Sequence, residues 1–175
     1  MSDKIYNVLF LCTGNSARSI LGESILRKLG AGKFNAFSAA SQPKGAVHPY
    51  ALTTLEACGF PVEGLRSKSW DEFSVADAPA IDFIFTVCDN AAGEACPVWP
   101  GHPMTAHWGI EDPAAENGSE IEKQRAFATA FHHLKNRIEL FCAIPLHRLD
   151  RLALRNRLQE IGDIDGATRP SNRTE

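Results

Sequence analysis

The stretch that decides the fold of this chain is Val8-Leu9-Phe10-Leu11-Cys12-Thr13-Gly14-Asn15-Ser16-Ala17-Arg18-Ser19. Its apolar first third predicts a buried strand, and its small and polar middle part predicts a loop. Its end predicts the start of an apolar helix. A tetrahedral anion such as phosphate or arsenate needs several inward-pointing backbone N–H groups and the N-terminus of a helix. The stretch therefore predicts a strand–loop–helix unit with an oxyanion site in its loop.

Two side chains of this loop carry the chemistry. The guanidinium of Arg18 is permanently charged and forked, so it can hold two oxygens of an anion. The same positive surroundings are expected to lower the pKa of Cys12 toward the attacking thiolate, with Ser19 donating a hydrogen bond to its sulfur. A lone cysteine in such a turn is most often inert packing, but the arginine at this offset favours a nucleophile. We expect the anion to be bound by Thr13, Gly14, Asn15, Ser16, Ala17 and Arg18.

Composition limits the class of protein. The 175 residues are 44% hydrophobic and 22% charged, which is enough apolar material for one ordinary globular domain. The net charge of -3 gives no broad basic surface, so we expect no nucleic-acid partner, and an anionic substrate must be held by a local site. The apolar run after Lys4 is too short for a signal peptide or a membrane span. We expect a cytoplasmic monomer with no membrane partner.

Strands and helices are predicted to alternate along the chain. Strands are expected at residues 4–11, 34–40, 81–87 and 104–108, and helices at 19–29, 49–57, about 120–142 and 145–161. This order predicts an α/β single domain with a doubly wound, four-stranded parallel sheet and helices on both faces. The domain is expected to span residues 1–162, and the polar tail 163–175 to be flexible.

Three reactive side chains follow the ends of predicted strands. Cys12, Cys88 and Asp112 come after the first, third and fourth strands of the expected sheet. Ligands of doubly wound sheets sit at the carboxyl ends of the strands. We therefore expect these three residues to meet at one edge of the sheet.

The chain has an odd number of cysteines: Cys12, Cys58, Cys88, Cys96 and Cys142. Without an export signal, a structural disulfide framework is not expected. Cys88 and Cys96 lie in one polar loop, where they could carry oxidising equivalents outward by thiol–disulfide exchange. A zinc site with His102 and His107 is the competing interpretation, but zinc-binding cysteine pairs are usually separated by two to four residues and seven separate these two. We expect no metal and no bound cofactor.

Together these residues carry a family resemblance. Residues 8–18 resemble the signature loop of the low-molecular-weight protein tyrosine phosphatase fold, which hosts phosphatases and thioredoxin-coupled arsenate reductases. Two further segments are similar to the reductase branch, namely Thr86-Val87-Cys88-Asp89-Asn90 leading to Cys96-Pro97, and His107-Trp108-Gly109-Ile110-Glu111-Asp112-Pro113-Ala114. The three motifs occur in the order of the family and cover most of the chain.

The resemblance implies a sequence of roles for the cysteines. Cys12 would bind arsenate covalently, Cys88 would attack that adduct and expel arsenite, and Cys96 would attack the resulting disulfide. The gap between the second and third cysteines is one residue longer here than is usual in the family. The external reductant is therefore expected to be thioredoxin, or glutathione with glutaredoxin acting on Cys88.

Other residues that carry the resemblance bear on whether the activity is that of a reductase or a phosphatase. Asp112 matches the general acid of the family, which would protonate a departing oxygen, although a rigid turn before Pro113 is the plainer interpretation. The phosphatase branch typically has a tyrosine where this chain has Ala114, which argues against phosphotyrosine as substrate. Glu23 resembles a cation-site residue of some relatives, and we expect a solvated or capping carboxylate there.

Two alternatives to an arsenate reductase stay open. One is a low-molecular-weight protein tyrosine phosphatase whose loop cysteines are incidental, because the Cys-x5-Arg-Ser loop at residues 12–19 serves both chemistries. The other is a non-catalytic oxyanion-binding or redox-sensing module in which Cys12 binds the anion or is oxidised without turnover. Such a module would not need the acid at Asp112.

Overall fold

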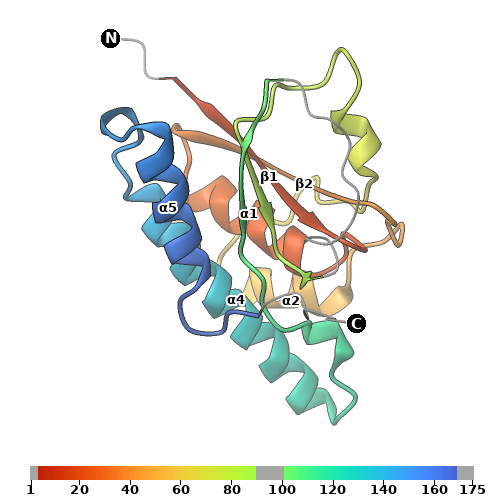
Figure 1. Ribbon diagram of the computed structural model, residues 1–175. Helices are drawn as coiled ribbons and strands as arrows, with labels where there is room; N and C mark the ends of the chain where they lie inside the picture. Colours follow the sequence, from red (N-terminus) through yellow and green to blue (C-terminus); the bar gives the residue numbers. More distant parts are fainter. Residues whose placement is uncertain (1–3, 90–100, 169–175) are drawn as a thin grey trace, which may run out of the picture.

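The computed structural model describes residues 4–89 and 101–168 and is built on one parallel sheet (Figure 1). The four strands are β1 (Tyr6–Cys12), β2 (Phe34–Ala40), β3 (Phe83–Thr86) and β4 (Met104–His107), in the order β2-β1-β3-β4. Leu11 of β1 lies opposite Thr86 of β3, which in turn lies opposite His107 of β4. The carboxyl ends of these three strands are therefore level with one another, as the predicted α/β fold requires.

The long helices of the described residues are α1 (Arg18–Leu29), α2 (Pro49–Ala57), α4 (Glu120–Cys142) and α5 (Arg151–Gly162). Three of these four, α2, α4 and α5, begin at a residue whose side chain caps them. The Ser119 hydroxyl accepts a hydrogen bond from the Glu122 amide at 3.2 Å at the start of α4. The carboxylate of Asp150 accepts from the amide of Ala153 at 2.7 Å at the start of α5.

Alternating side chains of β1 build two hydrophobic clusters, one on each face of the sheet. Val8 and Phe10 belong to the larger cluster, which α1, α2, α4 and α5 cover, whereas Leu9 and Leu11 face a smaller cluster containing Phe73. Phe73 comes from the short 3-10 helix η1 (Trp70–Phe73), which packs beside β2. The four-stranded, single-domain α/β fold is thus confirmed.

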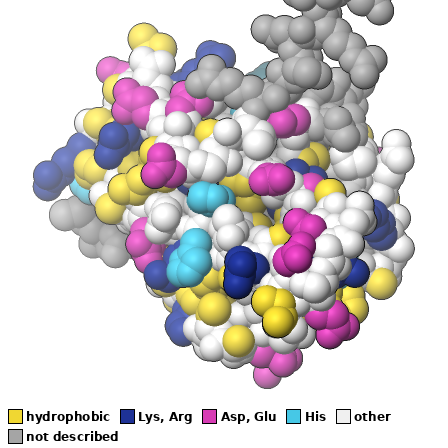
Figure 2. All heavy atoms as spheres, turned by 90° about the horizontal axis from the view of Figure 1, so that it is seen from below, with side chains coloured by type: hydrophobic (Ala, Val, Ile, Leu, Met, Phe, Trp, Pro, Cys, Tyr) yellow, Lys and Arg dark blue, Asp and Glu magenta, His cyan; other side chains and the backbone are white. Residues whose placement is uncertain are grey.

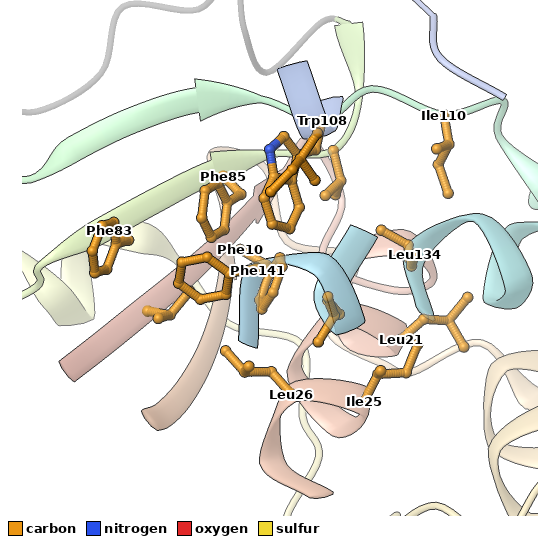
Figure 3. Close-up of a cluster of buried hydrophobic side chains, with 14 of the residues drawn as sticks. Phe10, Leu21, Ile25, Leu26, Phe83, Phe85, Trp108, Ile110, Leu134 and Phe141 are labelled. Atoms are coloured by element: carbon orange, nitrogen blue, oxygen red, sulfur yellow. The ribbon is translucent and has the colours of Figure 1, made fainter. Parts of the chain in front are cut away.

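Aromatic rings fill the centre of the larger cluster (Figure 3). Phe85 of β3 stacks on Trp108 with ring centroids 3.7 Å apart and an angle of 11° between the rings. Phe141 of α4 meets both rings edge to face. This packing fixes β3 and the segment after β4 against α4, and so fixes the edge of the sheet at which the strands end.

The last part of the chain differs from the sequence prediction. One helix was expected over residues 145–161, but Leu146–Arg148 form a separate 3-10 turn (η3), and Asp150 adopts the extended geometry of a cap before α5. Residues 163–168, expected to belong to a flexible tail, return to the body of the protein. Ala167 pairs with Ile110, and the Thr168 amide donates to the Gly109 carbonyl at 2.9 Å.

The helix α5 covers the edge strand β4 (Figure 1). The indole of Trp108 donates to the carbonyl of Leu158 at 2.9 Å, and Gly162 lies so close to the carbonyl of His107 that a larger residue there would collide with it. An exposed edge strand invites pairing with other chains, and this helix shields it. Within the described ranges, no helix is long and apolar enough to cross a membrane.

Candidate active site

The loop after β1 is held in shape by Asn15. Its backbone has a φ of 47°, in the left-handed region that asparagine tolerates better than most residues. Its buried side chain accepts a hydrogen bond from the Lys68 amide at 2.9 Å and donates one to the Ser19 hydroxyl at 2.8 Å. The loop is thereby fastened both to the start of α1 and to the segment beside β2.

The carbonyl groups of the loop are tied to a second segment that wraps around it. Those of Thr13, Gly14 and Ser16 accept from the amides of Gln42, Lys44 and His48 at 2.9, 3.0 and 2.9 Å. The amides of Thr13 and Gly14 point to the opposite side, toward the sulfurs of Cys88 and Cys12 respectively. Such a cradle of inward amides is suited to an anion.

The start of α1 leaves its own donors available for an anion. Ala17 occupies the cap position, and none of the described side chains caps this helix. The Arg18 guanidinium reaches across to the Ile110 carbonyl, 2.9 Å from Nη1, and to Asp112 Oδ2, 3.7 Å from Nη2. Its Nε is buried with no hydrogen-bond partner among the described residues, which is costly unless a ligand oxygen accepts from it.

Asp112 lies at the mouth of the loop. Its Oδ1 caps the short 3-10 helix η2 (Pro113–Ala115) by accepting from the Ala114 amide at 3.0 Å, and its side chain is 41% exposed. A surface hollow of about 760 Å³ begins at Asp112 and extends toward Arg125 and His133. The carboxyl group can thus reach both the anion site and water, as a proton donor must.

Cys88 lies against Cys12. The sulfur of Cys88 accepts a hydrogen bond from the Thr13 amide at 3.3 Å and lies 3.4 Å from the Thr13 hydroxyl, and both cysteines are buried. A second thiol therefore occupies the oxyanion cradle itself. The strand ends bring Cys12, Cys88 and Asp112 to one place, as the sequence predicted.

The proximity of Cys88 reverses the expected effect on Cys12. The pKa of Cys12 is raised well above its ordinary value, first by the hydrogen bond with Cys88, then by burial and by the neighbouring charge on Cys88. Arg18 and the Gly14 amide act in the expected direction but are outweighed. Two thiols that share one site cannot both ionise easily, which sequence spacing did not reveal.

Comparison with known proteins identifies the family. Residues 7–153 match the low molecular weight phosphotyrosine protein phosphatase family. The chain belongs to this family.

The relatives with the most similar sequences include several arsenate reductases. That of Oceanobacillus iheyensis is 33% identical over 141 residues, which are 81% of this chain and 96% of that protein. That of Bacillus subtilis is 32% identical over 141 residues, again 81% and 96%. A solved structure of an arsenate reductase in its phosphate-binding state matches with a TM-score of 0.61 at 27% identity, covering 79% of this chain and 97% of that chain.

The environment of Glu23 differs from the one expected from the sequence. Glu23, expected to be solvated or capping, is buried below the phosphatase-family loop, where it accepts a hydrogen bond from the Ser38 hydroxyl at 2.6 Å. It pairs with Arg27 at 2.7 Å and with the buried Lys68 ammonium at 3.6 Å. Burial lowers the pKa of Lys68, and the charge of Glu23 opposes that shift.

Sequence reasoning missed two lysines of this site. Lys68 is packed beneath the loop through Glu23, and the side chain of Lys44 lies over Gly14, where an added Cβ would come within 3.1 Å of it. Both lie in irregular segments without a periodic pattern. Lys44 stands in Gln42-Pro43-Lys44-Gly45, a composition that by itself is typical of any surface turn.

The remaining sequence candidates are distributed as follows. Cys96 lies outside the described residues. Cys58 is exposed at the end of α2, and burial raises the pKa of Cys142. Ser19 is buried and accepts from Asn15, while its bond to Cys12 stays a prediction. Within the described ranges, no group of three or more His, Cys, Asp or Glu side chains could hold a metal ion.

The face of the molecule seen in Figure 2 has no dominant charge. Acidic side chains are interspersed there with basic ones and with histidines. Together with the net charge of -3, this means that an anion is attracted by the loop itself and not by the whole surface.

Proposed function

We propose that this protein is an arsenate reductase that converts arsenate to arsenite in arsenic detoxification. The family match and the arsenate reductases among its relatives support this activity. The observation that carries the proposal is the Cys88 thiol beside Cys12 in the oxyanion cradle. Hydrolysis of a phosphate ester needs one nucleophilic sulfur, whereas reduction of arsenate needs two electrons, which a pair of adjacent thiols can supply.

The first step would be formation of a covalent adduct on Cys12. Arsenate would be held by the amides of residues 13–18, with the buried Nε of Arg18 donating to one of its oxygens. The Cys12 thiolate attacks arsenic, and one oxygen leaves as water with a proton from Asp112. Ser19, oriented by Asn15, would stabilise the thiolate.

The second step would be the reduction. The Cys88 sulfur attacks the Cys12 sulfur, the sulfur–arsenic bond breaks, and its electron pair stays on arsenic, which leaves as arsenite. In balance, arsenic acid and two thiols give arsenous acid, one disulfide and one water. The distance between the two sulfurs must permit a disulfide, and the hydrogen-bonded placement of Cys88 supports that requirement.

The third step would regenerate the thiols. Cys96 attacks the Cys12–Cys88 disulfide at Cys88, and the resulting Cys88–Cys96 disulfide is reduced by thioredoxin. If Cys96 cannot resolve Cys88, glutathione and glutaredoxin would do so. These thiol systems are found where cysteines stay reduced, so we place the protein in the cytoplasm. The proposed relay uses cysteines of one chain, and we propose that the protein acts as a monomer.

The test is arsenate-dependent oxidation of NADPH in the presence of thioredoxin and thioredoxin reductase. The intact protein is compared with Cys88→Ser and, as a matched control, with Cys58→Ser at the exposed cysteine of α2. Turnover by the intact protein and by Cys58→Ser, but not by Cys88→Ser, is the expected result. If arsenate gives no turnover with either thiol system, the proposal fails.

A second candidate function is that of a phosphatase, and one observation favours it. A hollow of about 170 Å³ beside Ala114 is lined by aromatic side chains, including those of His48, Tyr50 and Phe127. This hollow could receive the aromatic ring of a substrate. In the phosphatase branch, a tyrosine at the position of Ala114 would flank that ring. Rapid hydrolysis of an aryl phosphate by a protein that does not reduce arsenate would establish this function.

The third possibility, a module that binds or senses without turnover, is separated by Asp112→Asn. A catalyst loses turnover in this variant because its proton donor is gone. A binding module has no turnover to lose, and it should keep its affinity for phosphate in a calorimetric titration.

A further inference from the structure

The residue that follows Cys88 is held by two side chains from distant parts of the chain. Asp89 Oδ1 lies 2.8 Å from Nε2 of His107, at the end of β4, and accepts a hydrogen bond from the Thr168 hydroxyl at 3.0 Å. Nδ1 of His107 lies 2.7 Å from the hydroxyl of Thr86, at the end of β3. Asp89 is thus anchored to the edge of the sheet and to the C-terminal segment at once.

The chemistry of these groups fixes the direction of the bonds. An ionised carboxylate only accepts hydrogen bonds, so both Nε2 of His107 and the Thr168 hydroxyl donate to Asp89. In the tautomer that carries its proton on Nε2, Nδ1 of His107 is an acceptor that matches the Thr86 hydroxyl. Each polar group of the cluster has a matching partner, and bonds to a charged group are stronger than neutral ones.

The space beside Gly109 is filled by the cluster. A Cβ added at Gly109 would lie 2.5 Å from His107 Nε2, 2.7 Å from Asp89 Oδ1 and 2.7 Å from the Thr168 hydroxyl. Any larger residue at position 109 would therefore push the three partners apart. The glycine allows the three side chains to converge at one point.

The C-terminal segment that supplies Thr168 is itself fastened to the body of the protein. The buried guanidinium of Arg137 in α4 donates to the carbonyls of His133, Gly162, Ile164 and Asp165 at 2.9 to 3.4 Å. These bonds hold the turn after α5, and the Thr168 amide binds the Gly109 carbonyl. The family match ends at residue 153, so Thr168 belongs to a part of the chain beyond it.

We propose that Asp89, His107 and Thr168 are positioning residues that hold Cys88 against Cys12, so that a residue beyond the family match forms part of this support. The inference rests on the proposed function in assigning Cys88 a role. Its physical content is independent of arsenate: the cluster raises the effective concentration of the Cys88 thiol at Cys12 and so favours the disulfide between them.

The test is the reduction potential of the Cys12–Cys88 disulfide, measured in dithiothreitol buffers without arsenate. The full chain carries Cys58→Ser, Cys96→Ser and Cys142→Ser, so that a single pair can form. Two thiols lose two electrons and two protons to oxidised dithiothreitol, which becomes the dithiol. The disulfide fraction at each buffer ratio is read by mass spectrometry after alkylation of the free thiols.

Thr168→Val, which removes one donor to Asp89 and keeps the shape, is expected to weaken the disulfide about threefold to tenfold. This corresponds to a potential about 15 to 30 mV less negative. Gly109→Ala should weaken it further, because the added methyl group separates all three partners. Thr168→Ser keeps the hydroxyl and should restore the parental potential. Thr105→Val is the matched control, since Thr105 is exposed on the same strand as His107.

Two results would overturn the inference. One is a potential that stays within a few mV of the parent in both Thr168→Val and Gly109→Ala, even if these variants melt earlier, because the cluster would then serve stability alone. The other is an equal shift in Thr105→Val, which would indicate general loosening of the sheet edge. Failure of arsenate turnover in the intact protein would refute the proposed function. The measured effect of the cluster on the reduction potential of the Cys12–Cys88 disulfide would still hold.

Discussion

Replacement of Asn15 by alanine should loosen the loop that holds the oxyanion. The side chain is fully buried, accepts from the Lys68 amide at 2.9 Å and donates to the Ser19 hydroxyl at 2.8 Å. Asn15→Ala removes both bonds and places alanine at a φ of 47°, which it adopts reluctantly. Asn15→Gly removes the same bonds but tolerates this φ, so that the two variants separate the side chain from the backbone.

The expected loss follows from these contacts. The buried amide of Lys68 left without an acceptor costs about 1 to 3 kcal/mol, and the lost bond to Ser19 about 1 kcal/mol. The left-handed backbone adds about 1 kcal/mol for alanine. Asn15→Ala should therefore lower the free energy of unfolding by about 3 to 5 kcal/mol, and Asn15→Gly by about 1 kcal/mol less.

The assay is equilibrium unfolding in urea followed by tryptophan fluorescence, since Trp108 is buried. Asn35→Ala is the matched control, because Asn35 is exposed on β2 and bonds only at the surface to Asn7. It should change stability by about 0.5 kcal/mol or less. The reasoning is refuted if Asn15→Ala costs under about 1 kcal/mol, or if the glycine variant is no more stable than the alanine variant.

Three further outcomes follow from the site. Cys88→Ala should lower the pKa of Cys12, because the substitution removes the hydrogen bond and the neighbouring charge that raise this pKa. The pH dependence of alkylation by iodoacetamide measures the pKa, and a midpoint that does not fall contradicts the prediction. Arg18→Lys should weaken phosphate binding at least about tenfold in calorimetry, since lysine has no forked donor; near-normal affinity would disprove the clamp. Lys68→Met should destabilise the fold by about 2 kcal/mol in urea unfolding, because Glu23 loses a buried partner, and no loss would mean that the pair contributes nothing.

The sequence predicted the parts of the molecule that follow a periodic pattern or a short-range rule. The strand at 34–40 and the helix at 120–142 are examples, because burial of apolar side chains and capping are decided within a few residues. The meeting of Cys12, Cys88 and Asp112 was also predictable. In a parallel sheet the carboxyl ends of the strands lie at one edge whatever the loops do.

What could not be predicted depends on contacts between distant segments. The raised pKa of Cys12 comes from Cys88, 76 positions later in the chain, and no spacing rule gives the distance between their sulfurs. The burial of Glu23 depends on Lys68 arriving from another segment with a compensating charge. The ordered segment 163–168 looked like a tail because its composition is polar, yet its backbone and Thr168 are bound to the sheet edge.

The central claim is that two electrons pass from the Cys12–Cys88 pair to arsenic. The most direct test mixes the fully reduced Cys96→Ser protein with one equivalent of arsenate and no external reductant, then quantifies arsenite and maps disulfides by mass spectrometry. We expect one arsenite per protein together with a Cys12–Cys88 disulfide, and neither product in Cys88→Ser. Arsenite formed without that disulfide, or no arsenite while Cys12 remains reactive, would contradict the account.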